Sequence, residues 1–228
     1  HLTNILSKVA EHVIGDVLID FLQRGNFGPN QWAFTSARSA RDLVTALVMS
    51  WILAVCQNRI VGAYLSDISG AFDRAFREYL LAKLFRAGVG TDFLSFLMSY
   101  LEPRQGRVVV EGASSQPFEL ENTVFQGTVL GPTPWNVFFA DVAQPASSTG
   151  GSEAMFADDL NVFQTFDRYC PDASITDTLQ ICRSRVHAWG NRNRVTFDPD
   201  KEHLVIIHPH RGVGDDFKLL GCLVDCKL

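Results

Sequence analysis

The sequence predicts an α+β fold, in which helices and strands alternate without regular strand–helix–strand repeats. Hydrophobic residues make up 46% of the 228 residues, which is enough to build a sizeable core. Apolar residues recur at helical spacing in several stretches, and short apolar runs rich in β-formers lie between them. The chain has no internal repeat, so we expect one large domain or two small ones.

The helices are predicted from apolar periodicity and from the residues that end them. The first has apolar residues at every fourth position from Ile5 to Phe21. Asp73 is placed to cap the third, which Gly88 ends, and Pro103 follows the fourth. The expected helices are 2–22, 39–56, 73–87, 91–101, 134–142 and 175–191.

The strands are predicted from apolar runs bounded by turn residues. Segment 60–65 is expected to be a buried strand with Gly62 inside it. Two hairpins are expected, one around Glu111-Gly112 and one around the turn 157–159. The expected strands are 60–65, 107–110, 117–120, 154–156, 161–166, 204–207 and 218–224.

Composition narrows the class of protein. The net charge of −5 argues against a protein that holds nucleic acid through backbone contacts alone. The five cysteines include no C-x-x-C pair, so neither a zinc knuckle nor a disulfide scaffold is expected. This cysteine usage predicts a protein of a reducing compartment. The apolar run 43–56 is too short to span a bilayer and predicts a buried helix. No signal peptide follows His1, and the sequence is expected to be a piece of a longer chain.

Acidic residues stand at the ends of two predicted strands. Asp67 follows strand 60–65, and Asp158 and Asp159 lie in the turn of the second hairpin. Adjacent carboxylates repel each other, and a divalent cation such as Mg²⁺ turns that repulsion into attraction. Three carboxylates from neighbouring strands can hold two ions about 3.5–4 Å apart, as in-line phosphoryl transfer requires. From these residues alone, a strand end and an ordinary polar turn remain the alternative.

The motifs around these aspartates resemble those of the reverse transcriptases of non-LTR (LINE-type) retrotransposons. Segment 67–73 resembles the family's D-x-x-x-A-F-D motif, and 156–159 resembles its F/Y-A-D-D box. Segment 125–132, Phe-Gln-Gly-Thr-Val-Leu-Gly-Pro, is similar to P-Q-G-S-x-L-S/G-P. Further similarities are to the fingers motif Q-x-G-F-R-x-x-R-S at 31–39, to W…N…K at Trp189, Asn193 and Lys201, and to the F-K-Y-L-G primer grip at 217–221. The motifs follow the family's order and cover nearly the whole chain.

The resemblance implies a right-hand polymerase palm, an antiparallel sheet backed by helices, with part of the fingers and without a thumb. Residues 1–60 and about 90–124 would be fingers-like, and 61–89 and 125–228 would be palm. The implied function is RNA-directed DNA polymerase, which transfers a dNTP to a primer 3′-OH with two Mg²⁺ ions. The implied partners are an RNA template, a DNA primer, dNTPs and the missing thumb and other domains of the parent chain. No membrane partner is expected, and the location is nucleus or cytoplasm.

The resemblance also implies roles for individual residues. Asp67 and Asp158 would ligate both Mg²⁺ ions, with the Ile68 carbonyl as a further ligand and Asp159 as a more weakly bound third carboxylate. Lys201 would supply a positive charge or a proton near the leaving pyrophosphate.

The remaining implied roles concern the substrate. Phe72 would lie under the incoming sugar and exclude a 2′-OH, and Gln126 and Gly127 would border the template–nucleotide pair. Arg38 would contact the triphosphate, although the fingers motif departs from the family pattern at Thr35, where an arginine is usual.

Two other interpretations remain open. One is a reverse transcriptase of the group II intron maturase type. The other is a non-catalytic polymerase-like module in a larger assembly, which the acidic charge and the missing thumb favour for this chain in isolation. A two-metal nuclease is a weaker third alternative.

Overall fold

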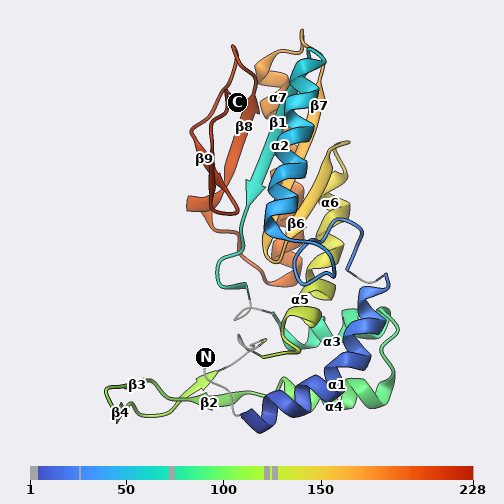
Figure 1. Cartoon of the computed structure of the whole chain (residues 1–228), viewed down its shortest axis with the longest axis vertical. Coiled ribbons are helices and arrows are strands. Elements are labelled where there is room, and N and C mark those ends of the chain that lie inside the picture. The colour runs from blue at the N-terminus through green and yellow to red at the C-terminus, as the bar shows by residue number, and fades with distance from the viewer. Residues whose placement is uncertain (1–4, 26, 72–74, 121–123, 125–127, 228) are drawn as a thin grey trace. The chain divides into compact units, whose positions relative to one another are not determined.

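The computed structural model describes residues 5–25, 27–71, 75–120, 124 and 128–227 (Figure 1). The chain divides into two compact units. One comprises 27–69 and 139–228, and the other comprises 1–26 and 70–138. These boundaries come from the packing of the chain, whereas the assignment of ranges to fingers and palm stays a prediction.

An antiparallel sheet of four strands forms the centre of the first unit, in the order β6-β7-β1-β8. The strands are β6 (Ser152–Phe156), β7 (Asp159–Phe166), β1 (Ile60–Ser66) and β8 (His203–Ile207). All residues of β1 are buried, as expected for a central strand with neighbours on both sides and helices on both faces. The sequence thus correctly predicted the buried strand 60–65 and the hairpin that supplies β6 and β7.

The helices α2 (Ala40–Cys56) and α7 (Asp172–Asn193) cover opposite faces of this sheet. Ser39 begins α2 by accepting a hydrogen bond from the amide of Asp42. Gly62 lets α7 approach β1 closely, since a Cβ at this position would lie 2.8 Å from Cγ2 of Ile175. Further elements are η2 (Ala140–Val142), α6 (Ala143–Ser147), η3 (Pro199–Lys201), β9 (Phe217–Leu219) and β10 (Cys222–Val224).

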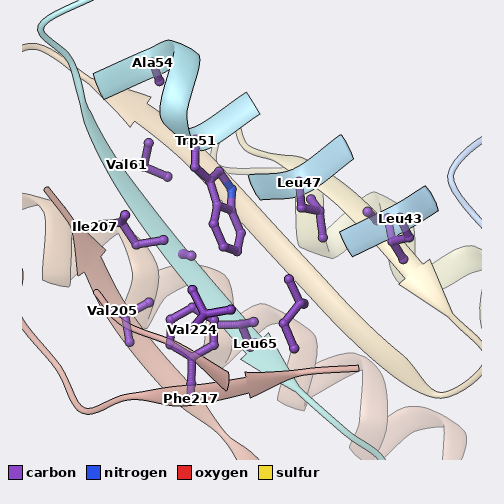
Figure 2. Packing of buried hydrophobic residues seen from close by; sticks show 13 residues of the cluster. Leu43, Leu47, Trp51, Ala54, Val61, Leu65, Val205, Ile207, Phe217 and Val224 are labelled. Atoms are coloured by element: carbon purple, nitrogen blue, oxygen red, sulfur yellow. The ribbon is translucent and has the colours of Figure 1, made fainter. Parts of the chain in front are cut away.

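The core of this unit lies between α2 and the sheet (Figure 2). Trp51 is its largest member, and its ring meets those of Phe163 and Phe217 edge to face, with centroids 6.3 and 6.2 Å apart. The other labelled side chains come from one stripe of α2, from alternate residues of β1, from β8 and from β9–β10: Leu43, Leu47, Ala54, Val61, Leu65, Val205, Ile207, Phe217 and Val224.

The second unit contains helices and two short hairpins. The helices are α1 (Ile5–Gln23), α3 (Arg77–Arg86), α4 (Thr91–Tyr100) and α5 (Pro132–Phe139). The hairpins pair β2 (Arg104–Gly106) with β5 (Phe118–Leu120) and β3 (Val109–Val110) with β4 (Ala113–Ser114). No helix in the described ranges has the length and hydropathy needed to cross a membrane.

Several predicted boundaries were wrong. Helix α3 begins at Arg77 with Phe76 at its N-cap, and the predicted cap Asp73 lies outside the described residues. The expected helix 134–142 is split into α5 and the 3₁₀ turn η2. The expected strand 218–224 is two strands, because Leu220 and Gly221 turn with φ of 48° and 85°. Of the expected strand 107–110, only Val109–Val110 forms a strand, β3, and the preceding strand β2 already ends at Gly106.

Candidate active site

Three aspartates gather at one end of the antiparallel sheet. Asp67 directly follows β1, and Asp159 is the first residue of β7. Ser66 is the register partner of Leu160, so the end of β1 lies beside the beginning of β7. Asp158 occupies the turn that leads into β7. The topology therefore brings together residues that stand about 90 positions apart in the sequence.

The turn that carries Asp158 is a tight one. Phe156 pairs with Asp159, which leaves only Ala157 and Asp158 to connect β6 with β7. Ala157 has φ of 56°, in the left-handed region that two-residue hairpin loops use at their first central position. The predicted start of the second strand at residue 161 was wrong, because the strand begins immediately after this short loop.

The electrostatics of the cluster are those of crowded carboxylates. Burial, followed by the charge of Asp67, raises the pKa of Asp158 to about 6. Burial, followed by the charges of Asp67 and Asp158, raises the pKa of Asp159 to about 7. Both pKa shifts show that the ionised carboxylates are held at a free-energy cost when only the chain's own groups surround them.

Lys201 compensates part of the negative charge of the three aspartates. Its Nζ lies 2.5 Å from Oδ2 of Asp67 and 4.0 Å from Oδ2 of Asp198. The hydrogen bond to Asp67, together with the charge of Asp67, raises the pKa of Lys201. The side chain of Lys201 is 61% exposed while that of Asp67 is only 14% exposed. The ammonium group therefore reaches the cluster from the solvent side and can move away from it without leaving a buried cavity.

The cluster borders a groove of about 700 Å³ in the same unit. Asp67, Asp158, Asp159 and Lys201 line one part of it. The segment from Phe217 to Gly221, which resembles the primer grip, contributes Phe217, Lys218, Leu220 and Gly221 to the same groove. The structure thus places two predicted motifs around one space. Groove residues that the sequence analysis missed are Leu65, Ser66, Asn161, Asp200, His203, Asp216 and Leu223.

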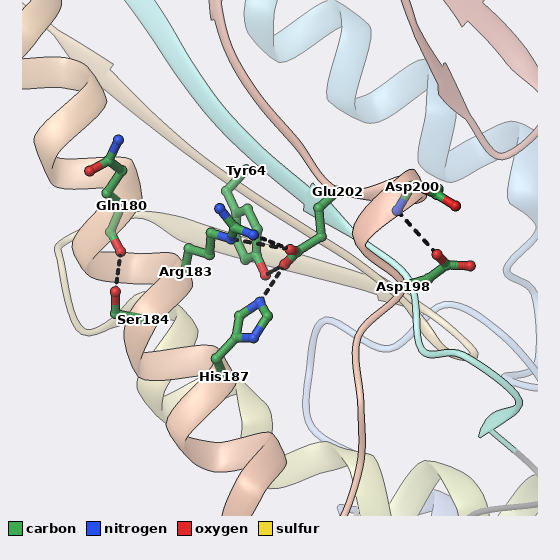
Figure 3. A network of polar contacts seen from close by, with 8 residues as sticks. All are labelled: Tyr64, Gln180, Arg183, Ser184, His187, Asp198, Asp200 and Glu202. Carbon is green, nitrogen blue, oxygen red and sulfur yellow. Dashed lines mark hydrogen bonds and ion pairs between the residues drawn. The ribbon is translucent and has the colours of Figure 1, made fainter.

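A buried polar network holds the segment next to Lys201 (Figure 3). The side chain of Glu202 is only 4% exposed. Its Oε1 accepts hydrogen bonds from Tyr64 at 2.6 Å and from His187 at 2.7 Å, and its Oε2 pairs with Arg183 at 2.8 Å. Although burial alone would raise it, these contacts lower the pKa of Glu202. Sequence analysis missed this network, since nothing in the local pattern links residue 202 to α7.

The other predicted site residues have different surroundings. Arg38 donates to the carbonyls of Pro29 and Gln31 at 2.7 and 2.9 Å and does not line the groove. Ile68 is buried and pairs with Phe197 across an antiparallel bridge. Trp189, the first residue of the W…N…K motif, is buried, and its Nε1 donates to Asp141 at 2.8 Å. Phe72, Gln126 and Gly127 lie outside the described residues.

The chemistry of the donor set fits a divalent cation. Asp67, Asp158 and Asp159 provide the carboxylate oxygens that hard cations prefer, and the raised pKa values show that a positive charge is favoured between them. Within the described ranges, no three acidic, histidine or cysteine side chains, these aspartates included, are arranged so that they could hold a metal ion without rearrangement. Asp67 is instead paired with Lys201, so a cation would have to replace this ammonium.

An antiparallel sheet that is backed by helices and gathers carboxylates at one end is the architecture of a polymerase palm. Residues 1–224 match the family model described as reverse transcriptase (RNA-dependent DNA polymerase). The chain belongs to this family. The match confirms the resemblance found in the motifs, and the reverse transcriptase family generally uses divalent metal ions.

The curated relatives are proteins of mobile elements. The chain is 29% identical over 206 residues to the probable RNA-directed DNA polymerase from transposon BS of Drosophila melanogaster, covering 88% of this chain and 22% of that protein. It is 36% identical over 122 residues to the RNA-directed DNA polymerase from mobile element jockey of the same species, covering 50% of this chain and 13% of that protein. The chain thus spans about a fifth or less of the length of these relatives.

Solved structures support the fold. An apo telomerase from Candida tropicalis, truncated from its C-terminal domain, aligns with a TM-score of 0.66 at 10% identity, covering 96% of this chain and 44% of that one. A telomerase from Candida albicans in complex with a fragment of telomeric RNA aligns with a TM-score of 0.61 at 12% identity, covering 88% and 35%. The predicted α+β fold with a polymerase palm is therefore confirmed.

Proposed function

We propose that this chain forms the catalytic core of a retrotransposon reverse transcriptase, an RNA-directed DNA polymerase. The observation that carries the proposal is the meeting of Asp67, Asp158 and Asp159 at one end of the sheet, beside the groove and Lys201. The transposon polymerases to which the chain is similar support the choice of reaction. The proposed substrates are an RNA template, a DNA primer and dNTPs, and the proposed location is the nucleus or cytoplasm.

Asp67 and Asp158 are the proposed ligands of two Mg²⁺ ions. Asp159 and the carbonyl of Ile68 are the further ligands proposed from this chain. When bound, Mg²⁺ stabilises the attacking and leaving oxygens of an in-line phosphoryl transfer. The carboxylates contribute by being fixed at the ends of paired strands, so little reorganisation is needed when the substrate arrives.

Lys201 is proposed to change partners during the reaction. Its ammonium pairs with Asp67 and is largely exposed, so it can turn towards the phosphates once a cation occupies the carboxylates. There it would neutralise the leaving pyrophosphate or donate a proton to it. The Glu202 network holds the neighbouring backbone while Lys201 moves. Roles for Phe72, Gln126, Gly127 and Arg38 in nucleotide binding remain proposals from the motifs.

Primer extension on an RNA template with dNTPs and Mg²⁺ tests the proposed function. The variant Asp158→Asn/Asp159→Asn should abolish extension and weaken Mg²⁺ binding. The matched control Asp92→Asn/Asp177→Asn removes the same charge from exposed helix positions and should retain both activities. Mg²⁺ binding without extension by the wild-type chain would refute polymerase activity of this chain while leaving the metal site intact. Neither binding nor extension would support a non-catalytic module, and cleavage of nucleic acid without dNTPs would indicate a nuclease.

A further inference from the structure

Gln31 is a buried polar residue that contacts the turn before the catalytic aspartates. Its side chain is 1% exposed and belongs to the loop that precedes α2. Its Oε1 accepts hydrogen bonds from the backbone amides of Ala33 and Ala157, both at 3.0 Å. Its Nε2 donates to the carbonyl of Ala157 at 3.3 Å. One amide side chain thus holds both the N–H and the C=O of the residue that leads into Asp158.

Ala157 is a residue that needs such support. Its φ of 56° places an L-residue with a Cβ in the left-handed region, which costs on the order of 1 kcal/mol or more relative to glycine. A conformation of this kind persists only where surrounding contacts fix it, and these are often found at functional sites. Because Asp158 and Asp159 follow directly, the direction of both carboxylates depends on this backbone turn.

The loop that carries Gln31 is itself fixed to the sheet. The amide of Met155 donates to Asn30 at 2.8 Å, and the amide of Trp32 donates to Met155 at 2.9 Å, so the loop continues the sheet beyond the edge strand β6. Arg38 braces the loop by donating to the carbonyl of Gln31 and by placing its guanidinium 5.0 Å from the Trp32 ring. Gln31 therefore approaches Ala157 from a rigid support rather than from a free loop.

We propose that Gln31 is a positioning residue, whose amide fixes the Ala157 backbone and so directs Asp158 and Asp159 towards Asp67 for cation binding. This inference rests on the proposed function. An amide is the side chain that this role requires, since it offers an acceptor and a donor at once. Glutamate would lose the donor and add a third negative charge beside two carboxylates, and methionine would lose both hydrogen-bonding groups while keeping a similar length.

Binding of Mn²⁺ alone to this chain, followed by electron paramagnetic resonance, tests the inference. Gln31→Met should weaken Mn²⁺ affinity by about tenfold or more. Asn30→Ala is the matched control, because Asn30 lies in the same loop and donates to Glu153 at 2.9 Å without touching the turn. It should change the affinity by less than about twofold. In primer extension, Gln31→Met should lower kcat more than it raises the KM for dNTP, and added Mn²⁺ should partly restore the rate.

A second comparison, with glycine at position 157, separates a loss of positioning from misfolding of the variant. Ala157→Gly removes the steric cost of the left-handed turn, so Ala157→Gly and Gln31→Met/Ala157→Gly can be compared as two folded proteins. The proposal requires the hydrogen bonds of Gln31 to restrict the more flexible glycine backbone too, so weaker Mn²⁺ binding by the double variant than by Ala157→Gly supports the positioning role, and equal binding by the pair overturns it. If the wild-type chain binds no Mn²⁺, the proposed function fails and this inference fails with it. If the wild-type chain binds Mn²⁺ and Gln31→Met binds it equally well, only this inference fails.

Discussion

The substitution Asp158→Asn/Asp159→Asn should stabilise the metal-free chain at neutral pH, although it should abolish the proposed activity. In the folded chain, burial and mutual repulsion raise the pKa of Asp158 to about 6 and that of Asp159 to about 7. A carboxyl group with a raised pKa binds its proton more tightly in the folded state than in the unfolded state. Stability therefore falls as the pH rises from about 4 to about 7, and it stays low above that range.

The size of this effect follows from the two raised pKa values. The pKa values of about 6 and about 7 lie well above the usual 3.8, and a difference of one in pKa corresponds to about 1.4 kcal/mol. The two groups repel each other, so their contributions overlap, and both are partly exposed, so solvent screens them. A combined destabilisation of about 1–3 kcal/mol at pH 8 is the result. The asparagine variant lacks these charges and should recover most of it.

Urea unfolding in EDTA at pH 5 and pH 8 measures the effect directly. From pH 5 to pH 8, the free energy of unfolding should fall by about 1–3 kcal/mol more for the wild-type chain than for the variant. Added Mg²⁺ should raise the stability of the wild-type chain at pH 8 and leave that of the variant unchanged, because ligand binding to the folded state alone stabilises it. An identical pH dependence for the two proteins would refute the argument that these carboxylates are held at a cost.

Three further predictions concern the framework of the site. Trp51→Ala should lower the free energy of unfolding in urea by about 3–5 kcal/mol, because it opens a cavity between α2 and the sheet. Gly62→Ala should cost about 1–3 kcal/mol by the same measurement, because the new Cβ would lie 2.8 Å from Cγ2 of Ile175 and 3.0 Å from the ring of Phe166. Glu202→Gln should lower the free energy of unfolding by about 1–3 kcal/mol, because Arg183 loses its anionic partner. Thermal unfolding measures this loss.

Local patterns predicted the elements of the site well. The apolar run of β1 and the acidic hairpin turn are short-range features, and both lie where the sequence placed them within a few residues. The approach of Asp67 to Asp158 and Asp159 depends on the register of β1 with β7 instead. Strand periodicity contains no information on register, so the residues alone left an ordinary turn as an alternative.

Helix α1 shows where periodicity misleads. The sequence correctly predicted a helix here, but the apolar row that predicted it, from Ile5 to Phe21, is exposed in the structure. The opposite face is buried and includes Glu11, which is 3% exposed and accepts hydrogen bonds from the amides of Val129 at 2.6 Å and Leu130 at 3.4 Å. A buried glutamate of this kind depends on partners 118 and 119 residues away, which no local pattern can indicate.

The location of the charges reconciles the acidic composition with the proposed nucleic-acid substrate. The net charge of −5 argues against a protein that binds phosphates through a basic surface. However, much of the negative charge lies in one groove, which is lined by Asp67, Asp158, Asp159, Asp200 and Asp216. Carboxylates at that density repel a phosphate until divalent cations bind, and then they form a site that attracts one. In the proposed function, the negative charge is therefore a condition for binding the nucleotide through metal ions rather than an obstacle to it. The experiment that separates these views is the Mg²⁺ dependence of dNTP binding, which should be lost in Asp158→Asn/Asp159→Asn.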